Sequence, residues 1–346
     1  MVELLRTARV VGLRRMLRLN RARRLGWEGI ISGFFTTRTM NALFNVGLFD
    51  ELVEKGRVNI ESFGMSRGLD TRILKALCDS LYSLGILKRD HLNYSLDSKG
   101  QLLVETARGW FDLIYGYEEI LHLLEPLLRK EIEYGKDVTR RSEFVAQGSG
   151  QIESWLYFPM GIDIISKNGF KRVLDLGCGD ATFLISLCNS SDTVTGYGVD
   201  ISPEAIADAH QKLEKAHLQG RVHLFTEDIF KLERIADSLQ GVDAATAFFV
   251  LHEFLFTDGD RVVRFLRNFR ELFPGVPLIL FEAIRPTPEE MRKRPGAAIQ
   301  YFLFHDLSKQ KPVSREDWKE LFSQAGFNSI SERYLGFART GIYTLC

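Results

Sequence analysis

His252 and Glu253 close a run of aromatic and aliphatic residues, FFVLHEFLFTDGD at positions 248–260, that the pattern predicts to be a buried strand. A polar, ionisable pair at the end of such a strand indicates a functional site. Three roles fit the pair: proton transfer by the imidazole, metal ligation, or capping of the following helix. The choice among them depends on the elements that position these residues.

Strands and helices alternate from about residue 169 to residue 346. The predicted strands are KRVLDLGC, VTGYGVDI, RVHLFTEDI, VDAATAFFVLH, PLILFEAI and GIYTLC, with helical stretches between most of them, such as 203–217 and 261–273. This alternation predicts an α/β fold with a doubly wound parallel sheet, which binds its ligands at the carboxyl ends of the strands. His252 would lie at that edge, at the end of the fourth strand.

A glycine loop, LDLGCGDATF, follows the first strand. Gly177 and Gly179 permit a tight turn and let a ligand approach the backbone at the amino end of the next helix. Asp200 closes the second strand, where a carboxylate can accept both hydroxyls of a ribose. Asp228 closes the third strand and is placed to reach an adenine amino group.

The loop differs from the dinucleotide fingerprint, which requires a small residue where this chain has Thr182. Asp175 lies on the strand beneath the glycines. An acid there suits a ligand that has an amino acid end and no pyrophosphate, because it can hold a water or an ammonium group. The loop therefore favours S-adenosylmethionine over NAD.

Residues 1–105 show short helices followed by a strand and a turn, which is a winged-helix pattern. The predicted recognition helix, 71–84, carries only Arg72 and Lys75 as cations, with Asp70 and Asp79 beside them. A helix that reads phosphates needs more positive charge, so we expect a packing or dimerising role. Residues 106–168 are interpreted as a helical connector that contributes to the substrate pocket, and 169–346 as the cofactor-binding catalytic domain.

The composition limits the classes of molecule that the protein is expected to bind. Lys plus Arg and Asp plus Glu each number 45 in 346 residues, so no overall field attracts nucleic acid or an anionic membrane. The sequence shows no apolar run of membrane-spanning length, its four cysteines show no CxxC pair, and we expect no signal peptide because the Arg-rich start lacks an apolar segment and a cleavage site. We expect a cytoplasmic protein that acts on a small organic substrate.

The motifs VLDLGCG, VDIS, EDIF and LHEF resemble those of the class I S-adenosylmethionine-dependent methyltransferases, over about residues 150–346. With the winged-helix pattern ahead of them, the whole chain is similar to the small-molecule methyltransferases whose amino-terminal domain dimerises. The resemblance implies a homodimer. The cofactor-binding residues that it implies are Asp175, Gly177, Gly179, Asp200, Asp228, Ile229 and Phe248.

Most of these enzymes methylate hydroxyls with the histidine of an LHDW motif as general base, and a glutamate that closes the next strand positions that histidine. The matching residues are His252, Glu253 and Glu282, with Phe254 in place of the tryptophan. The resemblance thus implies one candidate function, a metal-free O-methyltransferase with His252 as the base.

A second histidine supports another candidate. The segment IQYFLFHDLSKQKPVSREDW, which usually walls the substrate pocket, carries His305 and Asp306. This resembles the methyltransferases that act at C3 of α-keto acids such as phenylpyruvate or 2-ketoarginine, and that hold a metal with two histidines at about this separation. The implied ligands of a divalent metal, zinc or iron, are His252 and His305.

Carbon methylation of a keto acid requires an enolate, which a divalent cation stabilises. We therefore predict a C3-methyltransferase of an α-keto acid. Arg140 is the candidate for the substrate carboxylate, although an Arg-Arg pair is more often solvated, and Asp306 is the candidate for a cationic group such as a guanidinium. A third possibility, a winged-helix regulator that senses S-adenosylmethionine, conflicts with the low charge of helix 71–84.

Overall fold

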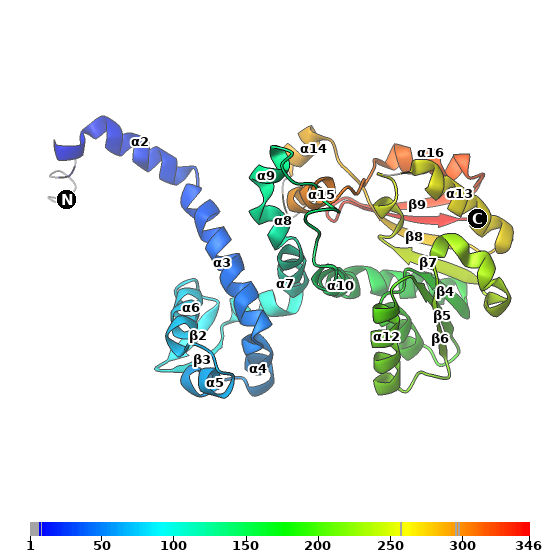
Figure 1. Ribbon diagram of the computed structural model, residues 1–346, viewed down its shortest axis with the longest axis horizontal. Helices are drawn as coiled ribbons and strands as arrows, with labels where there is room; N and C mark the ends of the chain where they lie inside the picture. Colours follow the sequence, from blue (N-terminus) through cyan, green and yellow to red (C-terminus); the bar gives the residue numbers. More distant parts are fainter. Residues whose placement is uncertain (1–6, 8, 257, 295, 297) are drawn as a thin grey trace. The chain divides into compact units, whose positions relative to one another are not determined.

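The computed structural model describes residues 7, 9–256, 258–294, 296 and 298–346 (Figure 1). The chain divides into two compact units, Met1–Asp112 and Leu113–Cys346, called here the first and the second unit. None of the described helices is both long enough and apolar enough to cross a bilayer.

The first unit contains a three-stranded antiparallel sheet in the order β1-β3-β2 and several helices. Its strands are β1 (Val58–Asn59), β2 (Leu87–Asp90) and β3 (Asn93–Leu96). Its helices are α2 (Leu13–Arg24), α3 (Trp27–Asn45), α4 (Leu48–Lys55), α5 (Ile60–Ser66) and α6 (Thr71–Ser83), and α7 (Ser98–Gly116) continues into the second unit.

The acids of the predicted recognition helix serve the first unit's own structure. Asp70 caps α6 by accepting hydrogen bonds from the amides of Arg72 and Ile73. Asp79 accepts hydrogen bonds from Lys75 and from Arg89 and Tyr94 of the sheet. These contacts fix α6 against β2 and β3, and the dimerising role of this unit stays a prediction.

The second unit has a seven-stranded sheet in the order β6-β5-β4-β7-β8-β10-β9. The strands are β4 (Arg172–Leu176), β5 (Thr195–Asp200), β6 (Val222–Thr226), β7 (Ala244–Phe248), β8 (Leu278–Ala283), β9 (Ile330–Leu335) and β10 (Thr340–Leu345). The strands β4 to β8 are parallel, which confirms the predicted doubly wound α/β fold. The expectation of parallel pairing is wrong for β10, which runs antiparallel to β8 and β9 because a short hairpin joins it to β9.

Helices cover both faces of this sheet (Figure 1). One face carries α13 (Gly259–Leu272) and α16 (Arg315–Gln324), and the other carries α10 (Ser142–Asn168), α11 (Thr182–Ser190) and α12 (Pro203–Ala216). The remaining helices of this unit are α8 (Glu118–His122), α9 (Leu124–Leu128), α14 (Pro288–Lys293) and α15 (Ala298–Leu307), with the 3-10 turns η1 (Ile229–Arg234), η2 (Ala236–Leu239) and η3 (Leu251–Glu253).

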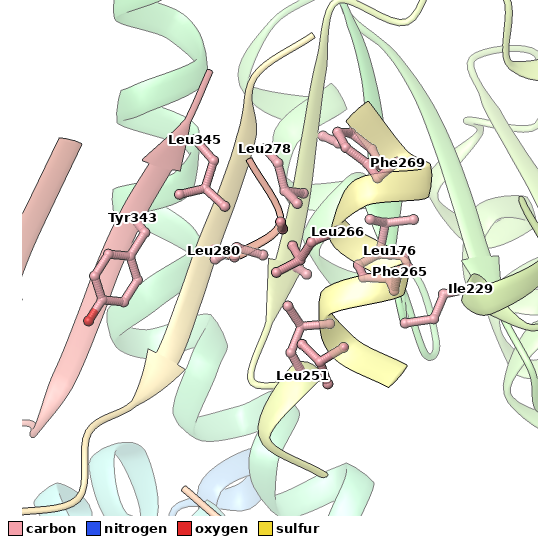
Figure 2. Close-up of a cluster of buried hydrophobic side chains, with 14 of the residues drawn as sticks. Leu176, Ile229, Leu251, Phe265, Leu266, Phe269, Leu278, Leu280, Tyr343 and Leu345 are labelled. Carbon is pink, nitrogen blue, oxygen red and sulfur yellow. The ribbon is translucent and has the colours of Figure 1, made fainter. Parts of the chain in front are cut away.

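The core beneath α13 holds the carboxyl edge of the sheet in place. Figure 2 shows Phe265, Leu266 and Phe269 of α13 lying against strand residues such as Leu176 and Leu278. All of these side chains are almost fully buried. Burying one such side chain contributes about 1.5–3 kcal/mol, so the core gives η3 and the loops at this edge a rigid support.

Candidate functional site

The glycine loop between β4 and α11 has the geometry that the sequence predicts. Gly177 and Gly179 adopt left-handed φ angles of 74° and 52°. A Cβ on Gly177 would lie 2.7 Å from a methyl group of Val250, so the loop has no room for a side chain there. The amide of Gly179 donates to Asp200, at 2.9 Å. The structure thus brings Asp200, at the end of β5, against the loop.

Asp175 lies on β4 beneath this loop and is 3% exposed. Burial raises the pKa of its carboxyl to about 7, and the charge of Asp200 adds to the shift, while a 2.7 Å hydrogen bond from the Thr246 hydroxyl opposes it. An acid with so high a pKa would bind a cation or a hydrogen-bond donor more favourably than an ordinary surface carboxylate.

The other predicted cofactor residues lie at or behind the same edge. Asp228 caps η1 through the amide of Phe230 and lies 3.4 Å from the guanidinium of Arg261. Ile229 and Phe248 are 7% and 8% exposed and belong to the two hydrophobic cores of the unit. These two side chains therefore support the cofactor edge from behind.

The two predicted metal ligands meet. His252 lies in η3, directly after β7, and Phe249 turns the chain there with a left-handed φ of 56°. His305 lies on α15, and the Nε2 atoms of the two histidines are 3.0 Å apart. The amide of Lys311 donates to the carbonyl of His252, which ties the segment after α15 to η3. Both rings are buried, with 2% and 6% of each residue exposed.

The hydrogen bonds of the histidines determine where their protons are. His305 Nδ1 lies 2.6 Å from the carbonyl oxygen of Tyr301, which can only accept. His252 Nδ1 lies 2.8 Å from a carboxylate oxygen of the fully buried Glu282, whose other oxygen accepts from the amide of Leu251. His305 therefore carries its proton on Nδ1 and has a lone pair on Nε2, and the carboxylate of Glu282 holds a proton on His252 Nδ1.

Two Nε2 atoms that lie 3.0 Å apart need a positive charge between them, which is either a proton held by His252 or a metal ion bound by both rings. Burial, and next the neighbouring His252, lower the pKa of His305 to about 2, so His305 does not supply that charge as an imidazolium. Two nitrogens bound to one zinc ion at about 2.0–2.1 Å would be separated by about 2.9–3.4 Å for bond angles of roughly 90° to 110°. The observed separation and the anchored Nδ1 atoms fit a divalent metal.

Among the described residues, no group of three or more His, Cys, Asp or Glu side chains is arranged to hold a metal. Two imidazoles would thus be the protein's share of the ligands. Such a centre leaves several positions for the oxygens of a bound molecule.

Arg140 and Glu253 form an ion pair beside the histidines, at 3.0 Å, and Gln310 donates to the same oxygen of Glu253. Burial acts to lower the pKa of Arg140, but the charge of Glu253 and the contact with Tyr117 outweigh it, so the pKa is raised and the guanidinium stays charged. The ring of Tyr117 stacks on Phe304 of α15 with centroids 4.5 Å apart. The structure therefore brings the predicted Arg140 to the histidine site.

Asp306 is not brought to that site. Its carboxylate pairs with Arg285, at 2.5 and 3.2 Å, and its side chain is 56% exposed. Successive residues of an α-helix point about 100° apart, so the inward direction of His305 turns its neighbour outward.

Two polar residues at this edge, Glu153 and Gln310, were not identified from the sequence, whereas Tyr301 was noted there as one of the aromatic residues that suit an aromatic substrate. Glu153 on α10 is half-buried, and no hydrogen bond or ion pair joins its carboxyl to another described residue. Tyr301 holds His305 through its carbonyl and stacks near its ring, at 4.2 Å between centroids. Gln310 bonds Glu253. The sequence offered one signal for Glu153, which is an acid within the largely apolar stretch IESWLYFP of α10.

Known proteins resemble this chain in sequence and in fold. Residues 174–273 match the family model described as a methyltransferase domain. The chain is 28% identical over 310 residues to the 2-ketoarginine methyltransferase of Streptomyces arginensis, an alignment that covers 88% of each chain.

Solved structures agree on the fold. The mitomycin 7-O-methyltransferase MmcR superposes with a TM-score of 0.70 at 17% identity, covering 95% of this chain and 99% of its own. Human N-acetylserotonin methyltransferase, solved in complex with its methyl donor, has a TM-score of 0.66 at 17% identity, with coverage of 94% and 99%.

Proposed function

Because the chain is a class I S-adenosylmethionine-dependent methyltransferase, as its domain match and its relatives show, we propose that it methylates C3 of an α-keto acid, with a divalent metal held by His252 and His305. The observation that carries this proposal is the pair of Nε2 atoms that lie 3.0 Å apart in a buried site, with the Nδ1 atom of each ring anchored by an acceptor. An O-methyltransferase needs one such nitrogen as a base and has no use for the second.

The relative with 28% identity supports the keto acid, because its printed name gives 2-ketoarginine as its substrate. The O-methyltransferases among the solved structures are similar at 17% identity, a level that concerns the fold alone. The substrate proposal rests on the histidine pair together with this one relative.

Each polar group at the site has a role in the proposed reaction. The metal would supply charge that stabilises the enolate of the keto acid. Glu282 would hold His252 in the tautomer whose Nε2 is a ligand, and the Tyr301 carbonyl would do the same for His305. Arg140 would bind the substrate carboxylate.

Glu253 is the proposed acceptor of the C3 proton. Its Oε1 accepts from Arg140 and Gln310, which fixes the carboxylate beside His252, and its side chain is 37% exposed. A carboxylate held in this way can take a proton directly or through one water.

The second candidate function is a metal-free O-methyltransferase in which His252 is the base. The 2.8 Å contact between His252 and Glu282 favours it, because a general base needs such an orienting acid. The two candidates differ in what they require of His305. Carbon methylation requires it as a ligand, whereas oxygen methylation tolerates its loss.

Deuterium exchange at C3 separates the two functions. Metal-loaded protein without methyl donor should exchange the C3 hydrogens of 2-ketoarginine or phenylpyruvate in heavy water, and a chelator should stop the exchange. His252→Ala and His305→Ala should each lose bound metal and turnover together, since one imidazole is too weak an anchor for a divalent ion. Full methyl transfer to a hydroxyl acceptor by metal-free protein in chelator would refute the keto acid proposal.

We further propose that the first unit dimerises and does not bind DNA. The helices α2 and α3 expose large apolar side chains, among them Leu17, Ile30 and Phe34, each more than 60% exposed. Contiguous exposed apolar residues of this kind are typical of an interaction surface. Light scattering should give the mass of a dimer at micromolar concentration. A monomer, or salt-dependent binding to arbitrary duplex DNA, would contradict this assignment.

A further inference from the structure

Glu153 lies on the face of α10 that is turned to the carboxyl edge of the sheet. Tyr157 follows it by one helical turn, so the two side chains project from the same face. The ring of Tyr157 packs edge-on against Phe249, directly after β7, and Phe281, within β8. Glu153 is therefore held over the edge that carries His252.

The largest charge effects on Glu153 come from acids. Asp175 and Asp180 lie on the side of the glycine loop, and Glu282 and Glu253 lie beside His252. Burial and these four charges together raise the pKa of Glu153 well above its ordinary value.

Two cations near these acids, Lys212 and Arg140, are already paired with other groups. Lys212 is bonded to Asp180, and Arg140 is bonded to Glu253. Among the residues that the structure describes, none forms an ion pair or a hydrogen bond with Glu153. The carboxyl is thus a negative group whose partner has to come from a ligand.

The methyl donor carries such a charge at the matching place. Its amino acid and ribose ends belong at the glycine loop and Asp200, and its methyl group must point to an acceptor beside His252. The sulfonium lies between these ends, and Glu153 is near enough to both pairs of acids for their charges to act on it. We propose that Glu153 is the counter-charge for the sulfonium of bound S-adenosylmethionine, so that the protein binds the cationic methyl donor in preference to the uncharged sulfur of the product.

This assignment depends on the cofactor and on neither the acceptor nor the metal. Methyl transfer removes the sulfonium charge, so the product S-adenosylhomocysteine loses the contact with Glu153 and leaves more readily. A contact made to the charge of the bound donor strengthens binding without accelerating the chemical step. Loss of the contact should therefore raise the KM for the methyl donor more than it lowers kcat.

Isothermal titration of Glu153→Gln with a matched pair of ligands tests the proposal. Sinefungin carries a protonated amine where the donor has its S-methyl group, and S-adenosylhomocysteine has neither charge nor methyl. We expect sinefungin and S-adenosylmethionine to bind Glu153→Gln about 10- to 100-fold more weakly, as for one lost charge-assisted contact, and S-adenosylhomocysteine to change less than about threefold. Glu143→Gln removes an exposed acid from the same helix and should change none of the three affinities.

Several outcomes would overturn the assignment. Equal weakening of all three ligands would mean that Glu153 shapes the site without sensing the charge, and unchanged affinities would remove it from the site. A loss of affinity confined to 2-ketoarginine, with phenylpyruvate unaffected, would assign the carboxyl to the acceptor. If Glu153→Gln does not fold, Glu153→Asp keeps the charge but shortens its reach, and sinefungin should still weaken more than S-adenosylhomocysteine. The same titrations on metal-free protein keep this test separate from the keto acid proposal.

Discussion

Substitution of Glu282 by Gln should change the proton position on His252 and thereby remove the metal site without disturbing the fold. Glu282 is fully buried and accepts two hydrogen bonds, from the amide of Leu251 at 2.7 Å and from His252 Nδ1 at 2.8 Å. The Gln oxygen must keep the buried amide of Leu251 satisfied, so its NH2 group faces His252. Nδ1 then has to accept, and the proton moves to Nε2.

The magnitude follows from these contacts. In Glu282→Gln, the protonated Nε2 of His252 donates to His305 Nε2 across the existing 3.0 Å, so the pair closes on itself and neither nitrogen is ready to bind a metal. The charge-assisted bond between the imidazole and Glu282 favours the ligating tautomer by about 1.5–3 kcal/mol, and Glu282→Gln removes this preference. That free energy corresponds to roughly 10- to 150-fold weaker metal binding, and a 10- to 100-fold loss is typical when a hydrogen-bond partner of a metal ligand is removed.

The assay is a competition titration of zinc against a chromophoric chelator, combined with nitrogen NMR of the labelled imidazoles to identify the tautomer. Glu253→Gln is the matched control, because Glu253 bonds Arg140 and Gln310 and makes no contact with either imidazole nitrogen, so it should slow turnover and keep the metal. Wild-type zinc affinity in Glu282→Gln, with the proton of His252 shown to be on Nε2, would refute the reasoning.

The remaining predictions concern the cofactor edge and the first unit. Asp200→Ala should weaken S-adenosylhomocysteine binding by about 2–4 kcal/mol in calorimetry, because two charge-assisted ribose bonds are lost, and unchanged affinity would remove Asp200 from the site. Asp175→Asn should stabilise the ligand-free protein at pH 8 by at most about 4 kcal/mol in urea unfolding. The pKa of Asp175 in the folded protein is about 7, so above that pH the buried carboxylate is charged and destabilises the fold, whereas an Asn amide is neutral and still accepts the hydrogen bond from the Thr246 hydroxyl. A lower stability of Asp175→Asn at pH 8 would contradict this account. Asp79→Asn should destabilise the first unit by up to about 2 kcal/mol at pH 7, and the difference from wild type should vanish as the pH falls from about 4 to about 2. Burial alone would raise the pKa of Asp79 in the folded protein, but hydrogen bonds from Lys75, Tyr94 and Arg89 lower it to about 2. A difference in stability that persists at pH 2 would therefore exclude these contacts as its source.

The sheet and the glycine loop could be predicted because their signals are local. Strand periods, the glycines and the acids at the strand ends all lie in short stretches of sequence, and each fixes the position of one residue relative to its own strand. The edge strand β9 was missed because ISERYL has four charged or hydroxyl side chains and is only half-buried. Its pairing with β10 depends on the hairpin, which a search for alternating strands and helices does not detect.

The details of the candidate site depend on directions in space that spacing in the sequence does not give. His305 and Asp306 are neighbours, and only the orientation of α15 determines that the histidine points inward while the acid meets Arg285. Glu153 was overlooked for the same reason, because a single acid on an apolar helix gains its meaning from the acids that it faces across the fold.

The strained features of the second unit have one property in common. Two imidazole nitrogens lie 3.0 Å apart at the histidines, the buried Asp175 has a pKa near 7, and Glu153 has no cationic partner among the described residues. Each feature is unfavourable in the free protein, and each becomes favourable when a positive charge arrives. Packing for stability alone would select against all three, since apolar residues of similar volume cost less. These unfavourable features lie at one edge of the sheet in the free protein. Binding of the cationic cofactor should relieve them and raise the melting temperature, by an amount that grows with the logarithm of the ratio of ligand concentration to Kd.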